Sequence, residues 1–194
     1  MYVTIYNIPM STETHIASAT EIIKKEYKLR NTWRLYFHSV TEDSWDDSTY
    51  KKLVDINTIN RFNQVINNIK NVTAGMFFLM KEDIFPTYED PNNTDGGYWT
   101  FRVSKKYAND VWEELTARLI GNTLTKDPKN MSQINGVTMS PKISNCIFKI
   151  WNVNAEVKDP YILMDDIAHI NLSEAKYQTH KANIERSKMY RSEK

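Results

Sequence analysis

Hydrophobic residues recur along the chain with two different periods, and these periods predict both strands and helices. Alternation in Trp33–His38 and the apolar run Met76–Met80, which follows Gly75, predict two strands. Apolar residues spaced three and four apart predict one helix that begins after Thr58 and another that ends at Gly121. The other predicted elements are strands at Leu53–Ile56, Tyr98–Val103, Gly136–Ser140, Cys146–Trp151 and Tyr177–Thr179, and a third helix at Asp159–Leu172.

The order of these elements predicts the fold class. Strands in adjacent pairs with interspersed helices predict an α+β fold, in which an antiparallel sheet carries helices on one face. The segment Phe85–Gly97 holds prolines, asparagines and two glycines, so we expect a long hairpin loop there. We find no internal repeat or low-complexity linker and therefore expect one domain, residues 27–194, after a variable leader, residues 1–26.

The composition narrows the class of protein. A chain of 194 residues that is 41% hydrophobic can bury a core without crosslinks. The single cysteine excludes a disulfide framework, and no apolar run approaches the roughly 18 residues of a membrane span. These features predict a soluble intracellular domain. The net charge of +1 argues against a protein that follows a long phosphate backbone.

Motifs for catalysis are largely missing from the sequence. It contains no Walker loop, dinucleotide fingerprint, nucleophile elbow or His-Glu-x-x-His motif. The four histidines are scattered along the chain. We therefore expect no enzyme, no cofactor and no metal site.

Two loops combine an aromatic residue with acidic neighbours. Trp45 lies within Glu42–Asp47, and Tyr88 lies within Pro86–Asp90. Exposing a large ring gives up roughly 1.5–3 kcal/mol of burial, and ring faces attract cations by about 0.5–2 kcal/mol. These loops favour a flat cationic ligand; the alternative is two solvated loops with incidental aromatic residues.

The order of these residues resembles the cap-binding translation initiation factor 4E family, over roughly residues 27–188. The most specific segments are Tyr88–Asp90 followed by Gly96–Trp99, and Leu119–Gly121 at the end of a helix that contains Trp112. The resemblance implies a single α+β domain. Its strongly curved antiparallel sheet would carry three helices on the convex back and the cap site on the concave side.

The resemblance also implies a role for each residue at the base. Trp45 and Tyr88 would sandwich N7-methylguanine, whose positive charge strengthens stacking, although the family usually has tryptophan in place of Tyr88. Glu89 matches the carboxylate that accepts hydrogen bonds from guanine N1–H and the N2 amino group. Trp151 matches the residue that touches the N7-methyl group.

The phosphate side matches the family less well. Lys142 stands where the family has an arginine, and Tyr98 and Ile147 stand where it has further basic residues. Strand alternation predicts that Lys149 lies on the same face as Trp151. The residues expected to bind the phosphates are Lys142, Lys149, Arg186 and Lys188. The alternative for the tail that holds the last two is a solvated, frayed terminus.

The convex side departs further from the family pattern. Asn63 replaces a partner-binding tryptophan, Glu113 replaces a leucine, and Ile59 keeps its apolar character. Tyr27–Leu29 stands in place of a His-Pro-Leu segment. The resemblance implies that Leu29, Ile59, Asn63 and Glu113 form the partner-binding positions. A scaffold protein related to or replacing initiation factor 4G, which carries a Tyr-x-x-x-x-Leu-Φ segment, is the expected partner.

The leading hypothesis is a monomeric, non-catalytic protein that binds the 7-methylguanosine cap of mRNA and recruits capped mRNA to translation. It would act in the cytoplasm, or in the host cytoplasm if the protein is viral. The alternative is a cap-binding repressor or sequestering protein that does not engage the usual scaffold. A cap-processing hydrolase is disfavoured because its His-x-His-x-His or Nudix motif is missing. A reader of another methylated cation is disfavoured because Glu89 would have no purpose there.

Overall fold

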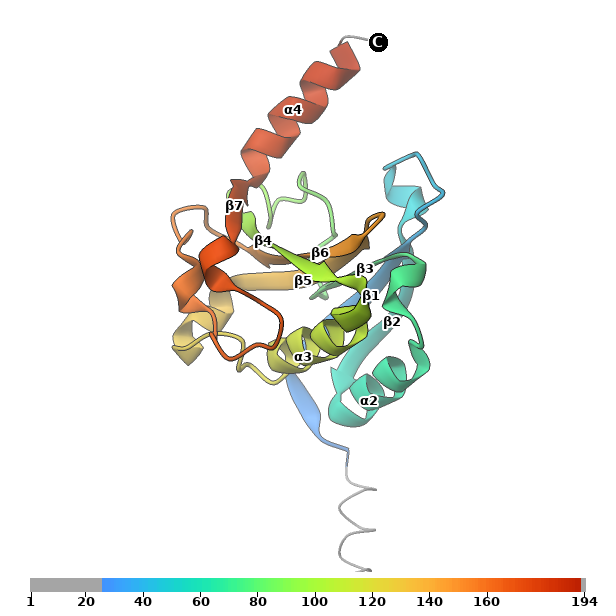
Figure 1. Cartoon of the computed structure of the whole chain (residues 1–194), viewed down its shortest axis with the longest axis vertical. Helices are drawn as coiled ribbons and strands as arrows, with labels where there is room; N and C mark the ends of the chain where they lie inside the picture. The colour runs from blue at the N-terminus through green and yellow to red at the C-terminus, as the bar shows by residue number, and fades with distance from the viewer. Residues whose placement is uncertain (1–25, 193–194) are drawn as a thin grey trace, which may run out of the picture.

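The computed structural model describes residues 26–192 and contains one seven-stranded sheet. Every pair of neighbouring strands is antiparallel, in the order β2-β1-β3-β5-β6-β4-β7 (Figure 1). The strands are β1 Lys28–His38, β2 Lys51–Thr58, β3 Met76–Lys81, β4 Gly97–Ser104, β5 Ile134–Pro141, β6 Asn145–Asn152 and β7 Lys176–Thr179. The α-helices are α2 Ile59–Asn68, α3 Ala108–Ile120 and α4 His180–Ser192. The predicted α+β class with an antiparallel sheet is confirmed.

Helices α2 and α3 lie on one face of the sheet (Figure 1). As the sequence predicts, α2 begins after Thr58 and α3 ends at Gly121. The Thr58 hydroxyl accepts a hydrogen bond from the Arg61 N–H and caps α2. Helix α3 ends at Gly121, but the residue in the left-handed region is Asn122, with φ of 57°.

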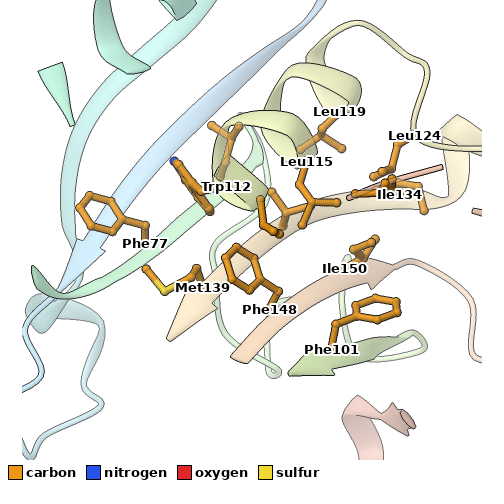
Figure 2. Packing of buried hydrophobic residues seen from close by; sticks show 14 of the residues in the cluster. Phe77, Phe101, Trp112, Leu115, Leu119, Leu124, Ile134, Met139, Phe148 and Ile150 are labelled. Carbon is orange, nitrogen blue, oxygen red and sulfur yellow. The ribbon is translucent and has the colours of Figure 1, made fainter. Parts of the chain in front are cut away.

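Alternation along the strands produces two separate clusters of buried residues, one on each face. On the helix side, Phe77, Phe148 and Ile150 pack beneath Trp112 and Leu115 of α3 (Figure 2). The alternate residues point to the opposite face and form a smaller, mainly aromatic cluster. Its buried members are Tyr36, Met76, Phe78, Met80, Ile84, Tyr98 and Trp151. The helix side therefore holds the main core, and the other face is left open.

The predicted helix at Asp159–Leu172 is wrong. This segment contains only short 3₁₀ turns at Pro160–Ile162 and Leu172–Glu174. Apart from these short local turns, its backbone bonds to a distant loop: the Met164 N–H donates to Leu124 O, and the Lys126 N–H donates to Ile162 O. The apolar residues of the segment are spaced for burial, but tertiary pairing replaces the helical hydrogen bonds. The third α-helix is α4, which rises from the end of β7 (Figure 1).

The predicted hairpin across Phe85–Gly97 is also wrong, because β3 and β4 are not neighbours. Strands β5 and β6 lie between them in the sheet. Residues 82–96 form a loop that is held together by hydrogen bonds from its own side chains. The Asp90 carboxylate accepts from the Phe85 N–H at 2.9 Å, and the Asn93 amide donates to the carbonyls of Phe85 and Thr87.

The predictions of a leader and of no membrane span can be compared with the structure only within residues 26–192. The predicted leader, residues 1–26, lies outside residues 26–192 except for its last residue. Within residues 26–192, no helix is long and apolar enough to cross a membrane. The one cysteine, Cys146, is buried in β6 with a free thiol.

Candidate functional site

A cavity of about 990 Å³ opens on the sheet face that lacks α2 and α3. This volume is within the range of small-molecule sites, roughly 300–1,000 Å³. Loops on both sides contribute to it, together with β3, β5, β6 and α4. The side chains that line it include Trp45, Tyr88, Glu89, Lys149, Trp151 and Ser187. Lys149 and Trp151 line the same cavity, so the prediction that they share a face is confirmed.

One wall of the cavity is built around Trp45, in the loop between β1 and β2. The indole stacks on the His38 imidazole with ring centroids 4.6 Å apart and planes 12° apart. His38 is fully buried, and its ring nitrogens lie 2.9 and 3.0 Å from the carbonyl oxygens of Ser39 and Ser44. Trp45 itself is 54% exposed. A fixed ring therefore supports one face of the indole and leaves more than half of the side chain open.

Another wall of the cavity is a stack of rings around Tyr88. The Tyr88 ring stacks on Trp151, with centroids 5.4 Å and planes 23° apart, and on Tyr98, with centroids 5.9 Å and planes 21° apart. Tyr98 and Trp151 lie opposite each other in the register of β4 and β6. Burial raises the pKa of Tyr88. Tyr88 is partly buried and packs against these two rings, and within residues 26–192 no ring contact joins it to Trp45.

Lys149 holds the hydroxyl end of that stack. Its ammonium donates a hydrogen bond to Tyr88 Oη at 2.9 Å and lies 4.1 Å from the centroid of the Tyr98 ring. Burial lowers the pKa of Lys149. None of the ion pairs formed within residues 26–192 involves this lysine. A cation thus stands in the cavity wall without an acidic partner.

His180 is a member of the stack that sequence reasoning gave no role. It is completely buried at the start of α4, and its ring centroid lies 4.7 Å from that of Trp151. Neither ring nitrogen has a hydrogen-bond partner among residues 26–192. Burial, assisted by the charge of Lys149, lowers the pKa of His180 to about 3. The imidazole is therefore neutral at physiological pH, and it adds no second positive charge to this wall.

The remaining predicted ligand residues are solvent-exposed. Glu89 lines the cavity next to Tyr88. Arg186 and Lys188 lie on α4 on either side of Ser187, which lines the cavity, whereas Lys142 lies in the turn after β5 and does not line it. Of the four residues predicted to bind the phosphates, only Lys149 lines the cavity. Their roles stay predictions.

The predicted partner-binding residues lie on the opposite side of the sheet. Asn63 on α2 and Glu113 on α3 are exposed, and Ile59 is 42% exposed. The Ile59 N–H donates to Tyr27 O at 2.9 Å, so the start of β1 lies beside the start of α2. Leu29 is partly buried against the helix-side core. The fold brings Ile59 near the segment Tyr27–Leu29, and no contact tests their predicted role.

Comparison with known proteins decides the family. The model of the family "Eukaryotic initiation factor 4E" matches residues 28–194. The chain belongs to this family. A translation initiation factor 4E homolog of Acanthamoeba polyphaga mimivirus is 27% identical to this 4E-family chain over 136 residues, which are 58% of the chain and 50% of that protein. The initiation factor NCBP of Oryza sativa is 28% identical over 158 residues, 77% of the chain and 67% of the factor. The chain thus spans a half to two thirds of the length of these relatives.

Solved structures show the same fold. The 4E-family chain matches C. elegans eIF4E-3, in complex with the 4E-binding protein Mextli and a cap analog, with a TM-score of 0.68 and 21% identity; the match covers 82% of this chain and 96% of that one. Ascaris suum eIF4E-3 with the m2,2,7G cap gives a TM-score of 0.65 at 22% identity, with 81% and 93% covered. At these identities the likeness shows the fold alone.

Proposed function

We propose that this chain binds the 7-methylguanosine cap at the 5′ end of mRNA and recruits capped mRNA to translation initiation without catalysis. One observation carries the proposal: the half-exposed Trp45 and the Tyr88–Trp151 stack line one cavity, together with the carboxylate of Glu89. Membership of the initiation factor 4E family supports it. The binding unit is residues 27–194, acting as a monomer in the cytoplasm, or in the host cytoplasm if the protein is viral.

The chemistry of the cavity suits a methylated guanine. A base that stacks on Trp45 gains roughly 1–3 kcal/mol, and its positive charge adds about 0.5–2 kcal/mol on a ring face. Glu89 accepts hydrogen bonds from guanine N1–H and the N2 amino group, and such charge-assisted bonds contribute roughly 1.5–3 kcal/mol. Adenine lacks that pair of donors. Trp151 is the ring for contact with the N7-methyl group.

Basic residues around the cavity supply the attraction for the phosphates. Lys149 lies in the cavity, and Arg186 and Lys188 are exposed on α4 where that helix reaches it through Ser187. Lys142 lies in the turn after β5 and would contact the distal phosphates of the cap. Because this attraction is electrostatic, affinity should fall as salt rises and as the phosphate chain is shortened.

A second candidate function is a cap-binding repressor or sequestering protein. The observation that favours it is the polar character of the helix side. Asn63 and Glu113 are exposed there, at two positions where the family resemblance implies a tryptophan and a leucine. A protein that binds caps but not the usual scaffold would withhold mRNA from initiation. In either case the partner of the helix side is a scaffold protein related to or replacing initiation factor 4G.

Calorimetric titration with 7-methyl-GTP tests the cap-binding proposal. Calorimetry is preferred to fluorescence because one variant removes a tryptophan. We expect Trp45→Ala and Glu89→Ala each to weaken binding at least about tenfold, or about 1.4 kcal/mol. Tyr161→Ala and Glu156→Ala remove an exposed ring and an exposed acid outside the cavity, and should bind as wild type does. Unchanged affinity in both cavity variants would refute the cap-binding assignment.

A further inference from the structure

The position of Lys149 is unusual for a pocket meant to hold a cationic base. Its ammonium lies 4.1 Å from the centroid of the Tyr98 ring and 5.4 Å from that of the Tyr88 ring. The protein thus already places a positive charge against two of the rings that form one cavity wall. Since no acidic side chain forms an ion pair with Lys149 within residues 26–192, this charge is not cancelled locally.

The neighbours of Lys149 leave the charge effective inside the cavity. Burial lowers the pKa of His180 and raises the pKa values of Tyr88 and Tyr98, so these three groups of the stack stay neutral. Glu89 lines the same cavity but is exposed, so water screens its charge. The side chain of Lys149 is partly buried. Burial lowers the pKa of its ammonium, and the charge of the protonated form interacts more strongly where solvent is excluded.

A fixed positive charge acts in opposite directions on the two halves of a cap. It repels the positive charge that N7-methylation adds to guanine, and it attracts the negative charges of the phosphate chain. An ammonium also has three N–H donors, and the contact with Tyr88 Oη uses one of them. A phosphate oxygen that reaches the wall therefore finds a donor in Lys149.

We propose that Lys149 determines ligand selectivity: it reduces the preference for methylated over unmethylated guanine and increases the preference for triphosphate over monophosphate. The ligand class is guanine nucleotides with a 5′ phosphate chain, and the inference rests on the proposed cap-binding function. The stacked rings fit methylated and unmethylated guanine equally well. Lys149 determines how much the positive charge of the methylated base contributes to binding affinity. Charge removal at this one position shifts both preferences at once.

The test is a set of affinities for four ligands: 7-methyl-GTP, GTP, 7-methyl-GMP and GMP. Lys149→Met removes the charge and keeps a long apolar stem. We expect the 7-methyl-GTP to GTP affinity ratio to rise at least about threefold, and the 7-methyl-GTP to 7-methyl-GMP ratio to fall at least about threefold. Lys149→Gln, a second neutral variant, should show the same two changes, and Lys149→Arg should keep both wild-type ratios.

Lys129→Met is the matched control, because Lys129 is exposed and lines a separate cavity of about 530 Å³. It should leave both ratios unchanged. A methylation ratio that stays the same in both neutral Lys149 variants overturns the inference, whatever the phosphate ratio does. Wild-type protein that binds none of the four nucleotides more tightly than Trp45→Ala overturns the proposed function, which is a distinct result.

Discussion

The two faces of the sheet use the same residue types for different purposes. On the helix side, Trp112 is 2% exposed and belongs to the buried core, where its ring contacts that of Phe77 on β3. On the cavity side, Trp45 is 54% exposed; its ring stacks nearly parallel on His38 and contacts Tyr50 at a tilt. The first tryptophan contributes buried area to folding, and the second leaves its side chain open to the cavity, where we propose that the ligand binds. On that proposal, stability and recognition depend on separate residues.

The outer surface of the helices extends this difference. The cavity keeps the aromatic and acidic types that the family resemblance implies, whereas α2 and α3 present Asn63 and Glu113 to solvent. Neither residue contributes to the core beneath, where Phe62 and Trp112 are buried. Changes at these two exposed positions therefore leave the packing beneath them intact.

The largest expected effect separates the two tryptophans by stability. Trp112→Ala should lower the free energy of unfolding by about 3–5 kcal/mol, because it removes a fully buried ring. Its buried indole N–H has no hydrogen-bond partner in the described part of the chain, which places the loss toward the low end of that range. Trp45→Ala should change stability by less than about 0.5 kcal/mol. Urea denaturation measures both, and equal losses would contradict the division between the faces.

The next prediction concerns partner binding on α2 and α3. A central tryptophan at an interface typically contributes about 2 kcal/mol or more, and an unpaired carboxylate opposes an apolar partner. Loss of both favourable residues should cost roughly 4 kcal/mol, about a thousandfold. We therefore expect no submicromolar binding of a Tyr-x-x-x-x-Leu-Φ peptide in calorimetry. Restoration in Asn63→Trp with Glu113→Leu would support the divergence, and tight binding by wild type would disprove it.

A third prediction uses the buried His180 on the cavity side. Its pKa is near 3 in the folded protein and near 6.5 when unfolded, so the unfolded state binds more protons between these values. Stability contributed by the neutral imidazole should be lost as pH falls from about 6.5 toward about 3. His180→Phe keeps a ring in the stack and should show a shallower loss than wild type in urea denaturation across this range. Parallel curves would show that His180 does not titrate in this way.

The smallest expected effect is at Tyr88. Tyr88→Trp enlarges the ring, so 7-methyl-GTP affinity should be unchanged or at most a few-fold higher, within about 1 kcal/mol. Calorimetry under the conditions used for wild type gives the comparison. A tenfold loss would mean that the hydroxyl contact with Lys149 contributes more than the ring area does.

Local periodicity was sufficient to predict much of the fold and part of the site. The apolar spacing after Thr58 and before Gly121 predicted α2 and α3 because both helices bury one side. Strand alternation placed Lys149 with Trp151, because side chains two positions apart share a face.

The remainder depends on contacts between distant segments. Apolar spacing in Asp159–Leu172 reports burial, but the backbone there bonds to residues 124–126. The partners of β3 and β4 cannot be read from the loop between them, because β5 and β6 come later in the chain. The inward packing of Tyr88 needs Tyr98, Lys149 and His180, which three different elements supply. A local sequence pattern cannot predict contacts between residues of three separate elements.

The strand order also has a consequence during synthesis of the chain. Ribosomes release residues in order, at roughly 5–20 per second, and β3 emerges well before its neighbour β5. Until then the apolar edge Phe77–Met80 has a partner on one side only, and such an edge is prone to pair with other chains. The cavity takes Phe78 from β3 and Trp151 from β6, so it exists only after residue 151 has left the ribosome. A nucleotide ligand can therefore stabilise the finished domain but cannot guide the nascent half that precedes it.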